Sequence, residues 1–158
     1  MRKINFVLFG SPKESYLSDA YKEYAKRLTK YAKVNFVFLD EVEVKGQLNQ
    51  SNIDKALDKE AEVLLKNINL SKTSLILFDL HGKEMNSEDF SKAIFKLPNL
   101  DMTFVIGSSN GLSDILREKA NLRVCFSKMT TTHPLALLFC LEQVYRAFKI
   151  DNNETYHK

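Results

Sequence analysis

The feature that most constrains the fold is a regular alternation of short apolar runs, rich in β-branched and aromatic residues, with longer segments of helical periodicity. The apolar runs predict five strands, at residues 4–9, 34–39, 74–80, 102–106 and 122–126. This alternation predicts an α/β fold, with a mainly parallel sheet covered by helices on both faces. Because no repeat or linker interrupts it, we expect one domain over residues 1–158.

The segments between these runs predict helices with recognisable start signals. We expect the second helix to follow a cap at Ser51 or Asn52 and the third to follow a cap at Ser87. A short helix follows Ser113, and the last helix covers residues 134–149. The first helix has one apolar face, formed by Leu17, Ala20, Tyr21, Tyr24, Ala25 and Leu28.

Charge is unevenly distributed along the chain. Residues 1–33 contain eight Lys and Arg against three acidic residues, whereas residues 34–100 contain eight against eleven. The basic first helix weakly favours an anionic partner, although a charged helix face is more often simply solvated. No apolar run approaches the roughly 18 residues that a membrane span needs. Cys125 and Cys140 have apolar neighbours typical of buried free thiols, which favours a cytoplasmic location.

The expected site lies at the carboxyl ends of the strands, where open parallel sheets bind ligands. Glycine, hydroxyl and histidine residues follow the third, fourth and fifth strands, at residues 79–83, 107–111 and 127–134. The spacing of Gly107 and Gly111 matches neither a dinucleotide nor a phosphate-binding loop. It allows close approach to a flat polar ligand, or simply a tight turn. The polar segment 40–49 is either a mobile loop near a substrate or an ordinary surface loop.

The three histidines are too isolated to predict a metal site, since none has a second ligand at zinc-like spacing. His133 precedes Pro134, and one interpretation is that it simply caps the last helix without a functional role. The tail ends in Tyr156, His157 and Lys158, where disorder is the default. If the tail folds back over the strand ends, these side chains could stack on a base, move a proton and bind phosphate.

Several segments together resemble one known family, the RlmH ribosomal RNA methyltransferases of the SPOUT class, over the whole chain. They are residues 104–112 (FVIGSSNGL), 126–130 (FSKMT), 133–134, 142–147 and 156–158. The resemblance implies an α/β knot with a carboxyl-terminal trefoil knot, which periodicity alone does not reveal. It also implies a cytoplasmic homodimer that uses S-adenosylmethionine to methylate N3 of a pseudouridine in 23S rRNA within the assembled 70S ribosome.

Residue chemistry suggests roles in catalysis and RNA binding, and the resemblance implies the residues that bind the cofactor. His157 is expected to act as base or RNA orienter, Arg146 to contact an anion and Tyr156 to stack. Lys158 and His133 are expected to contact RNA. The implied cofactor-binding residues are Phe78, Gly107, Phe126, Ser127, Lys128, Met129, Thr130 and Thr131.

Three positions depart from the family pattern: Ser108 replaces a usual glycine, Thr132 a proline and Leu137 an arginine. Serine fits at 108 if its φ is negative, and Leu137 removes an anion contact from the last helix. An apolar stripe on that helix is either core or a dimer interface. Two rival functions stay open. One is a Rossmann-type nucleotide-binding oxidoreductase, disfavoured by the single glycine after the first strand, and the other is a non-catalytic RNA-binding module.

Overall fold

The computed structural model describes residues 1–158 and contains one sheet of five parallel strands in the order β2-β1-β4-β3-β5. The strands are β1 (Lys3–Phe9), β2 (Lys33–Leu39), β3 (Thr73–Glu84), β4 (Asp101–Ile106) and β5 (Leu122–Cys125). The helices are α1 (Ser15–Leu28), α2 (Gln50–Asn67), α3 (Ser87–Phe95), α4 (Asp114–Lys119) and α5 (His133–Asp151). The predicted parallel α/β architecture is confirmed, whereas the trefoil knot stays a prediction.

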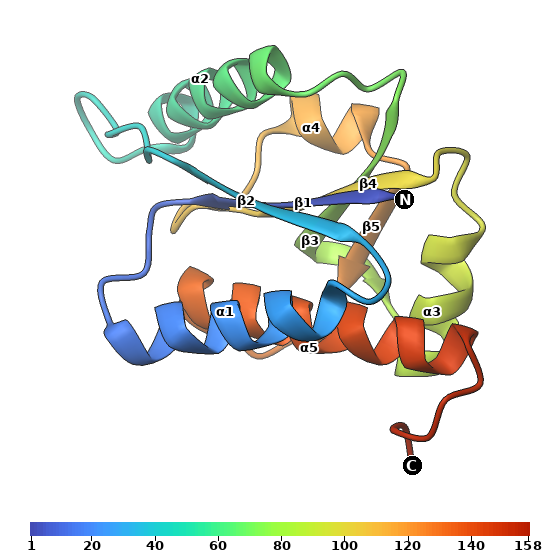
Figure 1. Cartoon of the computed structure of the whole chain (residues 1–158). Coiled ribbons are helices and arrows are strands. Elements are labelled where there is room, and N and C mark those ends of the chain that lie inside the picture. The colour runs from blue at the N-terminus through green and yellow to red at the C-terminus, as the bar shows by residue number, and fades with distance from the viewer.

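Helices cover both faces of the sheet, α1, α3 and α5 on one and α2 and α4 on the other (Figure 1). Right-handed crossovers explain this division, because connections that step toward β2 and connections that step away from it must pass over opposite faces. Alternate side chains of each strand therefore enter different cores. On β1, Phe6 and Leu8 pack with α1 and α5, while Val7 packs with α2.

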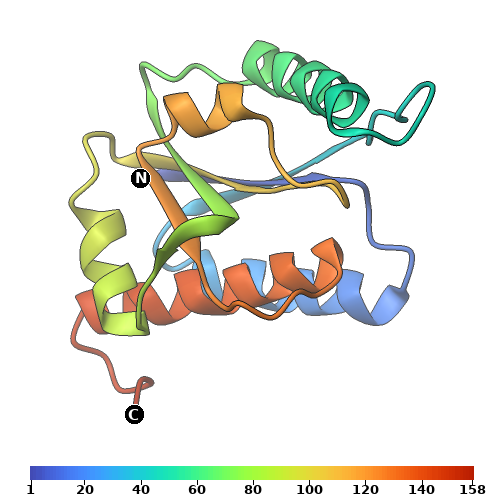
Figure 2. The same cartoon turned by 180° about the vertical axis from the view of Figure 1, so that it is seen from behind.

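Strand β3 is longer than predicted, because residues 79–83 continue it instead of forming a loop. Its pairing with β5 shifts between Phe78 and Lys83, and the strand bends sharply there (Figure 2). Gly82 allows the two strands to touch, since a Cβ at this position would lie 2.7 Å from the backbone carbon of Arg123. The bend turns Asp79 and His81 toward the carboxyl end of β4.

Two helix caps differ from prediction. The side chain of Asn49 accepts from the N–H of Asn52, and Asn86 accepts from the N–H of Asp89, so α2 and α3 begin earlier than expected. The competing serines were equally good caps by type, and only backbone geometry selects between neighbours. Ser113 caps α4 as predicted.

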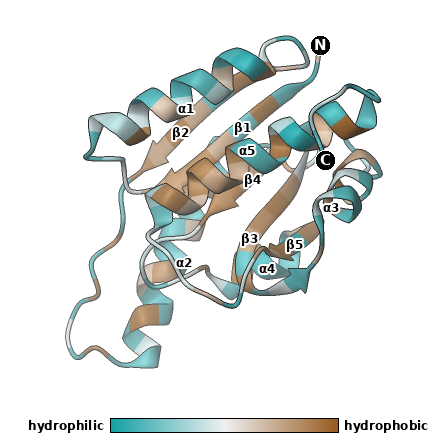
Figure 3. Cartoon of the chain, turned by 90° about the horizontal axis from the view of Figure 1, so that it is seen from below, coloured by the Kyte–Doolittle hydropathy of each residue, from teal (hydrophilic) through white to brown (hydrophobic).

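Most of the apolar stripe on α5 is core. Leu141, Val144 and Phe148 are buried against the sheet, whereas Leu135 and Phe139 of its first turns are exposed. Leu137 is also fully buried, so it packs in the core. This corrects the expectation that position 137 bears on an anion contact at an exposed face of the last helix. Figure 3 shows apolar strands beneath a more hydrophilic α1. None of the helices combines the length and apolar character needed to cross a membrane.

Candidate functional site

A cavity of about 700 Å³ opens at the carboxyl end of β4 and falls within the size range of small-molecule pockets. The topology explains its position. The chain leaves β4 toward the face that carries α2 and α4, but it leaves the neighbouring β1 and β3 toward the opposite face. The diverging connections leave a crevice at this edge, as in other open parallel sheets. The cavity lies at the edge where the sequence predicts a ligand site, and ligand binding there stays a prediction.

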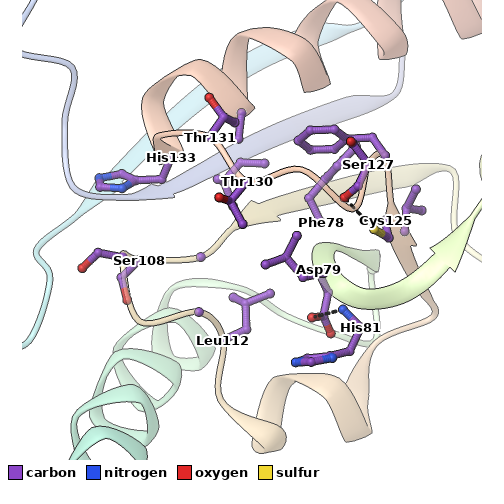
Figure 4. A pocket seen from close by; sticks show the side chains of 18 of the residues that line it. Phe78, Asp79, His81, Ser108, Leu112, Cys125, Ser127, Thr130, Thr131 and His133 are labelled. Carbon is purple, nitrogen blue, oxygen red and sulfur yellow. Dashed lines mark hydrogen bonds between the residues drawn. The ribbon is translucent and has the colours of Figure 1, made fainter. Parts of the chain in front are cut away.

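The glycine loop, defined as residues 107–111, forms one wall of the cavity (Figure 4). A Cβ on Gly107 would lie 2.5 Å from the carbonyl oxygen of Gly111, so no side chain fits at position 107. Gly111 has a φ of +99°, a conformation that favours glycine. Ser108 is outside the positive-φ region, so the serine is accommodated without backbone strain, as required.

The opposite wall is formed by the segment 126–131, which leaves β5 and reaches α5. Phe126 packs against Phe78 with ring centroids 5.7 Å apart, and both rings line the cavity. Ser127, Met129, Thr130 and Thr131 also line it, whereas Lys128 faces a shallower groove on the other side of the segment. The structure thus brings seven of the eight expected cofactor residues to one cavity. Their role in binding stays a prediction.

The floor beside β3 contains a buried ion-pair network that the sequence analysis missed. Asp79 is 5% exposed and pairs with Arg117 at 2.8 Å and with Arg123 at 3.1 Å. Burial disfavours its charged form, but the hydrogen bonds from Arg117 and from the N–H of His81 outweigh that effect and lower the pKa of Asp79. The carboxylate of Asp79 is therefore ionised and paired with two guanidinium groups.

The segment 40–49, called here the rim loop, reaches the mouth of the cavity. Glu41 accepts a hydrogen bond from the N–H of Ser109 at 2.9 Å, and its carboxylate lies 3.7 Å from His133 Nε2. His133 begins α5 and packs over Gly10 at the end of β1, where a Cβ would lie 2.9 Å from its ring. The sequence left two interpretations of this segment, a mobile loop near a substrate and an ordinary surface loop. Its contact with the glycine loop places it beside the candidate site, as the first interpretation requires.

Behind the glycine loop lies a second residue that the sequence did not reveal. Glu60 of α2 is only 3% exposed, and its carboxylate accepts from Ser108 Oγ at 2.9 Å and from the N–H of Val42 at 2.8 Å. Burial raises the pKa of Glu60, and these two hydrogen bonds oppose the rise. No cation accompanies the carboxylate. In the sequence, Glu60 looks like one of many helix-surface charges.

The carboxyl-terminal tail is ordered by contacts with the turn between α1 and β2, with α3 and with α5. Glu154 bonds Lys30 at 2.8 Å, Lys149 at 2.7 Å and the hydroxyl of Tyr31 at 2.9 Å. Lys149 first, then Lys30 and Tyr31, lower the pKa of Glu154 to about 2. The tail docks near the end of α5 that lies away from the cavity (Figure 1).

The expected catalytic side chains gather in this tail, not in the cavity. Tyr156 donates to Glu142 at 3.0 Å, and its ring lies 4.8 Å from the guanidinium carbon of Arg146. Arg146 bonds Nδ1 of His157 at 3.1 Å. None of Arg146, Tyr156, His157 and Lys158 lines the cavity within one chain. Folding back over the strand ends does not occur here, because the tail is held by Glu154 and Glu142.

The contacts of His157 fix its tautomer. A guanidinium has only donors, so Nδ1 must accept from Arg146 and a neutral ring must carry its proton on Nε2. That N–H points at Glu88 Oε1, 2.5 Å away. In this arrangement neither ring nitrogen has a free lone pair to accept a proton. Of the two roles expected for His157, this fits orienting the RNA better than acting as a general base.

Comparisons with known proteins agree with this geometry. The family model described as "Predicted SPOUT methyltransferase" matches residues 2–157. The chain is 44% identical to "Ribosomal RNA large subunit methyltransferase H" of Clostridium acetobutylicum, over 98% of this chain and 99% of that protein. It is 40% identical to the protein of the same name in Fusobacterium nucleatum, with the same coverage.

A solved structure has a similar fold. It is "The structure of a probable methylase family protein from Haemophilus influenzae Rd KW20", with a TM-score of 0.52 and 15% identity. The likeness covers 98% of this chain and 70% of that one. At this identity it supports the fold alone. The family model and the near full-length relatives confirm the resemblance seen in the sequence. The chain therefore belongs to the SPOUT methyltransferase family, in the group of the ribosomal RNA large subunit methyltransferases H.

Proposed function

We propose that this protein uses S-adenosylmethionine to methylate N3 of a pseudouridine in 23S rRNA on the assembled ribosome. The observation that carries the proposal is the cavity at the end of β4, which is walled by the glycine loop and by the segment 126–131. The names of the relatives support rRNA of the large subunit as the substrate. The absence of a dinucleotide fingerprint after β1 disfavours the rival oxidoreductase.

The residues of the cavity fit this cofactor. Gly111 has open space where a Cβ would lie, which lets a flat ring approach the backbone, and Ile106, Leu112 and Phe126 offer apolar surface to an adenine. Exposed hydroxyls of Thr130 and Thr131 can bind its polar groups. Bound there, the cofactor supplies an electrophilic methyl group on a sulfonium.

The chain's own residues have to orient the acceptor and favour the N3 anion. N3–H of a pseudouridine is a weak acid, so a nearby cation favours its ionised form. Arg146 and Lys158 are suited to this because each carries a charge at neutral pH, and Tyr156 offers a ring on which a base can stack. His157 donates its Nε2–H to Glu88 within one chain, so it would have to release Glu88 in order to hold an acceptor oxygen.

We propose further that the protein works as a homodimer, because one chain does not bring the tail to its own cavity. Leu135 and Phe139, 47% and 43% exposed, lie on the first turns of α5 beside the cavity and offer an apolar surface for a second copy. A partner packed there could place its tail over this cavity. Light scattering that shows a monomer at working concentration would refute the dimer.

Two measurements test the proposed function. Calorimetry should show binding of S-adenosylmethionine to the purified protein. Mass spectrometry of 23S rRNA from cells that lack the protein should show one pseudouridine without its N3 methyl group, restored when the gene is returned. Fully methylated rRNA in the deletion strain would contradict the proposal.

A further inference from the structure

Glu60 connects three parts of the molecule that are distant in sequence. It belongs to α2, its Oε1 accepts from Ser108 in the glycine loop, and its Oε2 accepts from Val42 in the rim loop. The two bonds have ordinary lengths of 2.9 and 2.8 Å, and the side chain is buried. One carboxylate thus fixes the glycine loop and the rim loop to the same helix.

A second bond holds the far end of the same wall. Asp58, also on α2, accepts from Ser113 Oγ at 2.6 Å, just after the glycine loop. The rim loop adds a bond of its own, from the N–H of Ser109 to Glu41. The wall between 108 and 113 is therefore anchored at both ends and from the side.

A buried carboxylate without a cation is a costly way to hold a loop. Removing a charged group from water is unfavourable unless the group is paired with an opposite charge, and two hydrogen bonds offset only part of that penalty. An apolar side chain at position 60 would pack at lower cost. Stability of the fold alone therefore does not explain Glu60, whereas its two partners both belong to segments at the mouth of the cavity.

We propose that Glu60 is a positioning residue for the cofactor, acting through Ser108 and Val42 to hold the mouth of the cavity in its binding shape before the ligand arrives. This inference rests on the proposed function. Preorganised walls lower the entropic cost of binding, because fewer backbone torsions have to be fixed when the ligand enters. Ser108 stands where the family pattern has a glycine, and its hydroxyl forms the bond between Glu60 and the glycine loop.

The test compares calorimetric Kd values for S-adenosylmethionine with melting temperatures. Glu60→Leu removes both bonds, and we expect Kd to rise about tenfold. Glu60→Gln keeps an acceptor for Val42 and a donor for Ser108, so its Kd should stay within about twofold of the wild type. Ser91→Ala is the matched control. It deletes a buried hydroxyl bonded to the carbonyl of Ala147 at 2.9 Å in the other layer, and it should leave Kd unchanged.

If Glu60 only stabilised the fold, its substitution would lower the melting temperature without a specific rise in Kd. We expect Glu60→Leu to melt no lower than Ser91→Ala while binding more weakly. If Glu60→Leu does not fold, Ser108→Ala serves in its place and should weaken binding by several-fold. In the variant that carries both substitutions the two losses should not add, because each substitution removes the bond between Glu60 and Ser108.

Three outcomes overturn the inference. They are an unchanged Kd in Glu60→Leu or Ser108→Ala, losses that simply add, and a Kd that rises only in proportion to the fall in melting temperature. A wild-type protein that fails to bind S-adenosylmethionine overturns the proposed function itself, and this inference with it. A wild type that binds normally beside unaffected variants overturns this inference alone.

Discussion

Replacing Gly107 by alanine tests the cavity with the smallest possible change. The added Cβ would lie 2.5 Å from the carbonyl oxygen of Gly111 and 2.9 Å from Leu112 Cγ. Backbone is the nearest obstacle, so the glycine loop itself has to shift. Overpacking of this kind costs about 1–3 kcal/mol. Without ligand the exposed tip of the loop can move and relieve the overlap, but a bound cofactor needs the loop in place.

The cost should therefore appear mainly as lost affinity. We expect the calorimetric Kd for S-adenosylmethionine to rise about tenfold to a hundredfold in Gly107→Ala. Ser91→Ala is the control here as well, because Ser91 does not line the cavity and belongs to neither loop at its mouth. Loss of its buried hydrogen bond should lower the melting temperature and leave Kd unchanged. An unaltered Kd in Gly107→Ala would refute the assignment of the cavity.

Three further predictions concern the tail and the buried ion pairs. His157→Ala should retain cofactor binding but lose most methyl transfer on ribosomes; wild-type turnover would remove this residue from the mechanism. Asp79→Ala should lower the free energy of unfolding, measured by urea denaturation, by about 3–5 kcal/mol, as for other broken buried pairs. Asp114→Ala is the control and should leave this free energy nearly unchanged, because Asp114 is 84% exposed. Because the pKa of Asp79 is lowered on folding, its contribution is present above the unfolded pKa of about 3.9 and is lost as pH falls through the folded value. Glu154→Gln should speed amide hydrogen exchange at residues 154–158 without changing cofactor binding, and slow exchange in this variant would argue against Glu154 as the anchor. In the wild type, acid should release the tail as pH falls from about 4.5 toward the folded pKa of about 2.

The sequence predicted the strands and the position of the cavity well, because both depend on local patterns. Short apolar runs between helical segments identify the strands, and parallel strands bring their carboxyl ends to one edge of the sheet. Gly107 and the segment 126–131 were therefore expected at one crevice. Local patterns failed where neighbours compete by small margins, as at the caps Asn49 and Asn86, and where the bend at Gly82 extended β3.

What the sequence by itself determined is the α/β fold, the edge of the sheet that carries the cavity, and the family. Only the tertiary structure decided which charges are buried and which residues meet across the sheet. Glu60 resembles any surface glutamate in the sequence, and its burial follows from how α2 packs against the glycine loop and the rim loop. His157 looked like a free base, but its tautomer is set by Arg146 and Glu88, which lie 11 and 69 residues away in the chain. Such pairings depend on long-range contacts that no local pattern encodes.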